Sequence, residues 1–572
     1  MPTLTKRKNK GHYYYYLVES ARVNGKPRIV SQKYLGTAEN IAKSVEFMSK
    51  GGIPEPEFSK VYEFGAVSAL FDLAERLGIG EIIERHTGKR KQGLSVADTV
   101  VLAAVNRAAE PVSKNGFYRW FERTVLSDRI EKANEKSLSS QGFWNNMNAL
   151  SAEGMRAAED DIIKEIVSRY DIATDCLLFD NTNFFTYIDT ATPGVLARRG
   201  KSKEHRTDLR IIGLSMMVSP DHNIPLFHEA YCGNMNDAKR FSEVVGDLKA
   251  RYEKLGKGRC TPTLVFDRGN NSEENIRKVL SANPREYNFV GGLRFNQCPE
   301  LTSLPKTEYR ALEGERLKGY TAARTKKEIY GAELTVVITY NPELFKAQAD
   351  GVGDNIAKCA EKLEALRAVL SARASGIVTK GKKPTVESVK KKIAGILSAE
   401  HMKTLFDCEV FEEEGHVNLS YCPDESKLED FKENVLGKSI LFSDHHEWET
   451  EKIVSAYHSQ YHVEQCFRQM KDTKYPAFRP QFHFTDAHIK VHAFYCVLAL
   501  TLCGVLQKET EMLGHKMSIH RMLDTLGDVK QVITVFPKIG NRQVVKSSFS
   551  GLDGIAKEYI DRYDLTKYAV KL

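Results

Sequence analysis

The stretch TLVFDRGNNS, Thr263–Ser272, joins a short apolar run directly to an acidic residue and then to the start of a helix. A brief run of this kind, bounded by turn-forming residues, predicts a buried strand. Asn271 or Ser272 can cap the following helix, because a side-chain oxygen there accepts a bond from a free amide group. CLLFD, at Cys176–Asp180, has the same apolar-then-acidic form. Strands that alternate with helices predict an α/β core.

The size and composition of the chain indicate a globular protein with several domains. At 572 residues it is too long for one hydrophobic core, so we expect three or more domains. Its 42% hydrophobic and 28% charged residues exclude a disordered chain. The net charge is only +8, but the basic residues are clustered at KRKNK (6–10), GKRK (88–91), ARRGKSKEHR (197–206) and along 380–392. Such clusters suit a polyanion such as nucleic acid, although each alone could be a solvated loop.

The cysteines and apolar segments predict an intracellular protein without a membrane partner. The ten cysteines show no CxxC pair or ligand-like spacing, which favours a reducing cytoplasm and no structural zinc. The N-terminal residues lack the apolar segment of a secretory leader. The most apolar stretch, Val491–Leu506, is 16 residues long, shorter than the roughly 20 that cross a bilayer. We therefore expect a buried core helix there.

Changes in pattern along the chain divide it into six expected segments. Strand-like runs on both sides of Asn24–Gly25 predict a hairpin, because this dipeptide favours a tight two-residue turn. The segments are an N-terminal β-hairpin region (1–55), a helical DNA-binding region (56–170), the first part of the α/β core (171–296), a β-rich insertion (297–437), the second part of the core with a long helix (438–512) and a C-terminal region (513–572).

Two aspartates stand where the α/β pattern would place a functional site. Asp180 and Asp267 each come at or just past the end of an apolar strand, and strand ends in one sheet meet at its rim. Glu464 would approach from a helix packed on the same sheet. Three converging carboxylates repel one another unless a cation lies between them, and hard oxygen ligands select Mg²⁺ or Mn²⁺. Two such ions, roughly 4 Å apart, support displacement at a phosphodiester. Among 75 acidic residues, however, any three could simply lie on the surface.

The stretch YHSQYHVEQCFRQMK, Tyr457–Lys471, predicts one amphipathic helix that carries Glu464. Tyr457, Glu464 and Lys471 are seven residues apart and so share one face. Gln460 and Arg468 lie one turn on either side of Glu464. The same pattern, alone, is typical of a solvated helix face with an ion pair.

These motifs resemble those of the DDE transposases of bacterial insertion sequences. The resemblance rests on LLFDNTNFF, TLVFDRGNNS and the Glu464 stretch, in this order, with similar segments at 198–209, 224–241 and 479–500. The Glu464 stretch is similar to the Tyr-x2-Arg-x3-Glu-x6-Lys signature of one group of this family. Tyr457, Glu464 and Lys471 fit its spacing, but Gln460 occupies the Arg position.

The resemblance implies an RNase H-like fold, interrupted before the glutamate helix by a β-rich insertion. It also implies a catalytic triad of Asp180, Asp267 and Glu464 that binds two Mg²⁺ or Mn²⁺ ions. The implied activity is cleavage at the terminal inverted repeats of a transposon, followed by joining of the freed 3′-hydroxyl to target DNA. The implied partners are double-stranded DNA, as transposon ends and target, and a second copy of the chain in a synaptic homodimer. The expected location is the cytoplasm of a bacterial or archaeal cell, at the nucleoid.

The resemblance and the basic clusters together predict the residues that contact DNA. Tyr457 and Lys471 would hold phosphates near the cut, and Arg468 would replace the cation that Gln460 removes. The expected DNA contacts are Tyr457, Gln460, Arg468, Lys471, Arg268, Arg198, Arg199, Lys201, Lys203 and Arg206. Two alternatives stay open at this point: an RNase H-like nuclease that cuts without joining, and a domesticated DNA-binding protein that no longer cuts.

Overall fold

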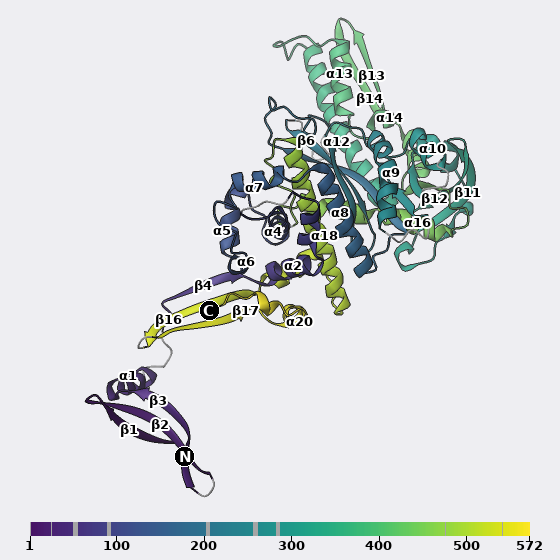
Figure 1. Cartoon of the computed structure of the whole chain (residues 1–572). Coiled ribbons are helices and arrows are strands. Elements are labelled where there is room, and N and C mark those ends of the chain that lie inside the picture. The colour runs from purple at the N-terminus through teal and green to yellow at the C-terminus, as the bar shows by residue number, and fades with distance from the viewer. Residues whose placement is uncertain are drawn as a thin grey trace.

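The computed structural model describes residues 2–23, 26–49, 55–88, 93–201, 206, 208–255, 261–281, 287–474, 476–539 and 542–571. The predicted turn at Asn24–Gly25 and the predicted DNA contact Lys203 lie outside these residues. The described chain consists of a central body, an arm that projects from it, and a small N-terminal sheet at the opposite end (Figure 1).

A nine-stranded mixed sheet forms the centre of the body, which confirms the α/β class. Its strand order is β10-β11-β12-β15-β9-β8-β5-β6-β7. The strands are β5 (Cys176–Thr186), β6 (Arg210–Val218), β7 (Pro225–Cys232), β8 (Thr263–Phe266), β9 (Asn288–Leu293), β10 (Arg310–Ala311), β11 (Thr321–Ile329), β12 (Ala332–Tyr340) and β15 (Lys438–Ser443). The strands β5, β8 and β9 run parallel, and the other neighbours are antiparallel.

Helices cover both faces of this sheet, which explains why its central strands are apolar along their length. Every residue of β6 is buried. On one face, Phe241 of α9 (Asp237–Lys254) contacts the rings of Phe179 and Phe266 at centroid distances of 5.4 Å and 5.0 Å. Successive side chains of a strand point to opposite faces. The residue after Phe179 therefore points to the other face, where α17 (Tyr461–Lys471) packs on β5 and β6.

Two predictions about individual elements were wrong. The strand that contains Asp180 does not end there but continues to Thr186, because β6 pairs with it as far as that residue. The stretch Tyr457–Lys471 is not one helix: α16 (Thr450–His458) ends first, and α17 begins three residues later at Tyr461. The seven-residue spacing therefore does not place Tyr457 on the same helix as Glu464.

The region that follows the small N-terminal sheet is helical, as expected, and packs around one long helix. Its helices are α2 (Gly65–Arg76), α3 (Ile79–Arg85), α4 (Val96–Ala109), α5 (Phe117–Glu122), α6 (Leu126–Arg129), α7 (Ser140–Asn148) and α8 (Ala152–Arg169). The helix α10 (Glu273–Ser281) belongs instead to the α/β core, where it lies beside α9. The long helix α18 (Asp486–Met512) contacts α2, α4, α7 and α8. By length and composition it could cross a membrane, but 94% of its most apolar 18-residue window is buried within the protein. It is the core helix that the sequence predicted.

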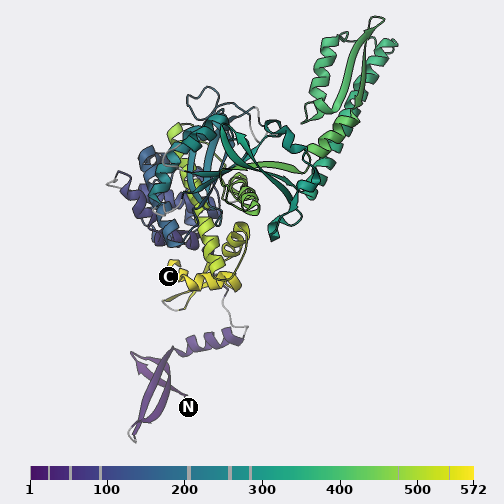
Figure 2. The ribbon, with the colours of Figure 1, turned by 90° about the vertical axis from the view of Figure 1, so that its right-hand side faces the viewer.

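The expected insertion at 297–437 is smaller and more helical than predicted. Strands β10 to β12 lie within this range but extend the central sheet through the pairing of β12 with β15. The projecting arm begins only after them, as Figure 2 shows, and it has a hydrophobic core of its own. The arm contains α12 (Pro342–Ala374), α13 (Val386–Ile396), α14 (Met402–Leu405), β13 (Phe406–Glu413), β14 (His416–Pro423) and α15 (Glu425–Asn434).

The two ends of the chain form separate small sheets. Strand β4 (Phe58–Glu63) pairs with β16 (Lys530–Ile539), which pairs with β17 (Arg542–Ser550), so an N-terminal strand completes a C-terminal hairpin. Helices α19 (Ile519–Gly527) and α20 (Gly554–Arg562) flank this hairpin in sequence. The N-terminal sheet contains β1 (Pro2–Asn9), β2 (His12–Val23) and β3 (Lys26–Gly36), followed by α1 (Ala38–Ser49). The predicted pairing of β2 with β3 is present, with β1 as a third strand.

Candidate active site

The two predicted aspartates emerge side by side at one edge of the sheet. Strands β5 and β8 are parallel, and their last paired residues are Phe179 and Phe266. Asp180 and Asp267 follow these two residues directly, so the register of the strands brings both to the same level. The pairing of β5 with β8 ends there, and the backbone after β8 turns away into a loop. The two aspartates therefore lie side by side although β5 itself continues beyond Asp180.

Glu464 joins the two aspartates around one cavity. It lies in the first turn of α17, on the exposed side of the helix, while Val463 and Phe467 on the adjoining side are buried. The cavity measures about 430 Å³ and is lined by Asp180, Thr182, Asp237, Asp267, Gly269, Asn270, Glu464, Phe467, Arg468 and Lys471. The structure thus brings together the three predicted acidic residues and two of the predicted cationic residues.

Tyr457 touches this site through Asp267. Its hydroxyl donates a hydrogen bond of 3.0 Å to Oδ1 of Asp267. Burial, together with the nearby Asp267 carboxylate, raises the pKa of Tyr457 above its ordinary value, so the phenol keeps its proton and remains a donor. The neighbouring strand leaves room for this ring, because a Cβ on Gly292 would stand only 2.7 Å from the Tyr457 hydroxyl oxygen. In this conformation the hydroxyl orients a carboxylate, although the sequence predicted that it binds DNA.

A buried polar network holds the loop that carries Asp267. Asn181 of β5 donates to the side chain of Asn270 at 2.9 Å and accepts from Ser215 at 2.7 Å. Arg240 of α9 donates to the hydroxyl of Ser215 at 3.0 Å. Asn275 donates to the backbone carbonyl of Asn270 at 2.9 Å. Since all of these bonds are shielded from water, they fix the backbone on which Asp267 stands.

Asp237 is a fourth acidic residue of the cavity, and the sequence analysis missed it. It is the first residue of α9, where Asn236 caps the helix by accepting a 2.9 Å bond from the Ala238 amide. Burial, with the charges of Asp237 and Asp180, raises the pKa of Tyr231. The signal available in the sequence was only an Asn-Asp pair at a helix start, which usually indicates capping.

The remaining predicted cations on α17 differ in their surroundings. Arg468 is exposed at the cavity. The Lys471 ammonium lies 5.7 Å from the ring centre of Phe184, and its backbone carbonyl accepts a 2.9 Å bond from Arg479. Gln460 is buried, with its amide nitrogen 3.5 Å from the Phe179 carbonyl oxygen. In this conformation Gln460 packs against β5 and does not line the cavity.

The other predicted DNA contacts that the structure describes lie outside the cavity lining. Arg268 is exposed beside Asp267. Arg198 pairs with Ile211 through the backbone, and Arg199 donates to the Thr190 hydroxyl at 3.4 Å. Lys201 is exposed.

Arg206 is held by an acidic neighbour in sequence. It binds both carboxylate oxygens of Asp208, at 2.9 Å and 2.8 Å. This bidentate hydrogen bond lowers the pKa of Asp208 to about 2. The Asp208 charge therefore offsets that of Arg206 and weakens its attraction for a phosphate.

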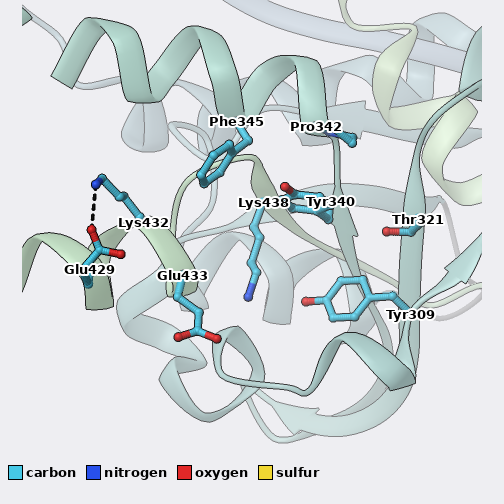
Figure 3. Close-up of a pocket in the computed structure, with 9 residues that line it drawn as sticks. All are labelled: Tyr309, Thr321, Tyr340, Pro342, Phe345, Glu429, Lys432, Glu433 and Lys438. Atoms are coloured by element: carbon cyan, nitrogen blue, oxygen red, sulfur yellow. Dashed lines mark hydrogen bonds and ion pairs between the residues drawn. The ribbon is translucent and has the colours of Figure 1, made fainter. Parts of the chain in front are cut away.

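A larger cavity of about 560 Å³ lies at the base of the arm and contains none of the predicted site residues. Figure 3 shows the amine of Lys438 between Glu433 and the hydroxyl of Tyr309, with Lys432 paired to Glu429. Its size alone does not make it the reaction site, because the acidic residues that the motifs select line the smaller cavity.

The donor chemistry of the smaller cavity fits a hard divalent cation. Four carboxylates line it, and carboxylate oxygens are the ligands of Mg²⁺ and Mn²⁺. In the described part of the chain, however, no group of three or more His, Cys, Asp or Glu side chains is placed so that it could hold a metal ion. The carboxylates therefore have to turn toward one another before they can share an ion.

Comparisons with known proteins include a match to a solved structure. No family model and no curated protein sequence matches the chain. The structure is similar to the piggyBac transposase in a synaptic complex with hairpin DNA, determined by cryo-EM, over 81% of this chain and 78% of that one. The TM-score is 0.36 and the sequence identity is 11%. Values this low do not establish that the two chains share a fold.

Proposed function

We propose that the chain is a DDE transposase of an insertion sequence, of the group with the Tyr-Arg-Glu-Lys signature. It would bind the terminal inverted repeats of its element, cleave the DNA at the ends and join the 3′-hydroxyls to target DNA. The observation that carries this proposal is the single cavity lined by Asp180, Asp267 and Glu464, with Arg468 and Lys471 beside them. Residues far apart in sequence supply acidic and basic groups to this one cavity. Metal-assisted chemistry on a phosphodiester requires such acidic groups to hold the metal ions.

The order of the strands supports an RNase H-like core within this proposal. Strands β5, β6 and β7 form an antiparallel meander, and β8 and β9 continue the sheet parallel to β5 on its other side. This is the order of an RNase H-like core. The arm then lies between β12 and β15, before the helix that carries Glu464, where the family resemblance places an insertion.

In the proposed mechanism Asp180, Asp267 and Glu464 would hold the divalent ions, with Asp237 as a further oxygen donor. Two bound Mg²⁺ or Mn²⁺ ions supply an activated water or 3′-hydroxyl and neutralise charge on the leaving oxygen. Tyr457 orients the Asp267 carboxylate through its hydrogen bond. Arg468 and Lys471 attract the phosphates of the strand, as cations at the rim of an acidic site.

Purified protein, a labelled duplex that contains one end of the element, and Mg²⁺ test the proposal. A transposase gives cut and joined products, a nuclease gives cut products only, and a DNA-binding protein gives only a mobility shift. Asp180→Asn and Glu464→Gln should abolish cleavage. Glu274→Gln, an exposed carboxylate of α10 outside the cavity, is the matched control and should cleave normally. Cleavage that survives both active-site substitutions would contradict the site assignment.

The proposal extends to assembly and location. Two chains would pair the two ends of the element in a synaptic homodimer, in the cytoplasm of a bacterial or archaeal cell. Mass photometry of the protein with and without end DNA tests the assembly, and a dimer that forms on end DNA is the expected result.

A further inference from the structure

The N-terminal sheet carries almost all of the net charge of the protein. Residues 2–36 contain eight Lys or Arg and one acidic residue, Glu19, which gives a net charge of +7. The whole chain has a net charge of +8, so the remaining residues are nearly neutral. A charge so concentrated in one small sheet creates a local positive field and indicates an anionic partner.

Strand register places most of these cations on one face of the sheet. Residues that pair directly across antiparallel strands share a face, and alternate residues of one strand share it too. Lys6 pairs with Tyr15 and Lys8 with Tyr13, while Leu17 pairs with Lys33. The same face, here called the basic face, carries Leu4, Lys6, Lys8, Tyr13, Tyr15, Leu17, Glu19, Ala21, Lys26, Arg28, Ser31 and Lys33. Five of the eight cationic side chains are therefore on the basic face.

The basic face is open, and the opposite face combines one buried side chain with exposed ones. Tyr13 and Leu4 on the basic face are 48% and 55% exposed. Their neighbours Lys6 and Lys8 lie 5.2 Å and 5.7 Å from the ring centre of Tyr13, which independently places them on its face.

On the opposite face, Tyr34 contacts the rings of Tyr14 and Tyr16, at 6.0 Å and 5.2 Å. Val18, also on that face, is only 4% exposed. That face supplies the small core around Val18, but its Tyr34 and Ile29 are 56% and 52% exposed, so the choice of the basic face rests on its larger number of cations.

We propose that the basic face of the N-terminal sheet docks on duplex DNA and supplies much of the affinity for the transposon end. This inference rests on the proposed function for the identity of the DNA. Antiparallel strands lie about 4.8 Å apart, so the β1–β2 hairpin fits a major groove about 12 Å wide. The lysines then reach phosphates at the groove walls, and the exposed tyrosines contact sugars and bases.

The composition of the basic face favours DNA over an anionic membrane. A membrane-bound surface presents a continuous apolar face with cations around it. Here the cations lie on the outer strands β1 and β3, and the central strand β2 between them presents Tyr13, Tyr15, Leu17 and the acidic Glu19, so hydroxyl groups and a carboxylate interrupt the apolar surface. Rows of cations on either side of a row of aromatic rings match the two phosphate backbones of a duplex with the bases between them.

The test measures binding of the full-length protein to a labelled duplex of about 40 base pairs, by fluorescence anisotropy over a range of salt concentrations. Lys6→Ala/Lys8→Ala removes two charges from the basic face. Arg7→Ala/Arg22→Ala removes two charges from the opposite face and is the matched control. Circular dichroism checks that the strands of each variant are intact.

Loss of two phosphate contacts should reduce the slope of log Kd against log salt concentration by about 2. The Lys6/Lys8 variant should show this reduction, with affinity at least fivefold weaker near 0.1 M salt, and the control should change the affinity less than twofold. When Arg28→Ala and Lys33→Ala are added to the Lys6/Lys8 variant, the total reduction of the slope should be up to about 4. Equal losses in the variant and its control, or no loss in either, would overturn the proposal.

Two further experiments test the kind of partner and distinguish this inference from the proposed transposase activity. The first experiment compares duplex DNA with single-stranded RNA of equal length and with vesicles that contain phosphatidylserine. If either of these binds more tightly than duplex DNA, and the binding depends on Lys6 and Lys8, the choice of DNA is overturned. If wild-type protein cleaves and the basic-face variant binds normally, only this inference fails. If the variant loses DNA binding but wild-type protein never cleaves, the inference stands and the proposed transposase activity fails.

Discussion

Substituting Tyr457 by Phe separates a positioning role from a DNA contact. The change removes one hydroxyl that donates a 3.0 Å bond to Asp267 and leaves the half-buried ring in place. A hydrogen bond to a charged group contributes about 1.5–3 kcal/mol, which corresponds to a rate loss of roughly 10- to 150-fold if it orients the carboxylate for reaction. We expect this loss in the single-turnover rate of strand cleavage at saturating DNA and Mg²⁺, while the Kd for end DNA changes less than twofold.

Gly292 provides a second route to the same contact. Gly292→Ala puts a methyl group where only 2.7 Å separates it from the Tyr457 oxygen, so the hydroxyl must move away from Asp267. It should slow cleavage of the wild-type protein but have little further effect in the Tyr457→Phe background, because the displaced hydroxyl is already absent. Additive losses in the double variant would refute this coupling. A Tyr457→Phe protein that cleaves at the wild-type rate, or that loses mainly DNA affinity, would refute the positioning role itself.

Three further predictions concern residues around the core. Asp237→Asn should lower the cleavage rate at least tenfold without weakening DNA binding, as single-turnover assays and anisotropy would show; a normal rate would exclude Asp237 from the site. Burial raises the pKa of Glu159, but His228 and Arg251 outweigh it and lower the pKa to about 2. The stability that this carboxylate contributes, of the order of 3 kcal/mol, is present above about pH 4.5 and is lost as pH falls toward 2. Urea titrations between pH 7 and 3 should show a shallower loss of stability for Glu159→Gln, and an unchanged slope would contradict the assignment. Gln460→Arg, which restores the family signature, should lower the melting temperature because it buries a guanidinium against the Phe179 carbonyl; an unchanged melting temperature would show that the arginine reaches solvent.

Local patterns predicted the parts of the site that depend on single strands. The strand before Asp267 could be predicted because TLVF is a short apolar run bounded by turn-forming residues, which favours a buried strand. The apolar stretch at 491–506 predicted the core helix because its 16 residues are too many for an ordinary strand and too few to cross a bilayer. The α/β class followed from the alternation of such runs with helical patterns.

Other features depended on pairing between distant segments, which leaves no local signal. Asp180 looked like a strand end because the apolar run stops there, but pairing with β6 carries the strand to Thr186. The spacing of Tyr457, Glu464 and Lys471 suggested one face of one helix. The first helix instead ends at His458, and a second begins at Tyr461. Tyr457 reaches the site only because Gly292, on a strand 165 residues earlier in the chain, leaves space for its ring.

The sequence alone determined which residue types could perform the chemistry and where buried strands and helices would form. The tertiary structure decided which acidic residues meet: strand register places Asp180 beside Asp267, and helix packing brings Glu464 and Asp237 to the same cavity. It also decided that five of the eight N-terminal cations share one face, because that depends on the pairing of three strands. Side-chain chemistry and short-range periodicity are local properties of the chain, whereas convergence on one site is set by contacts between residues hundreds of positions apart.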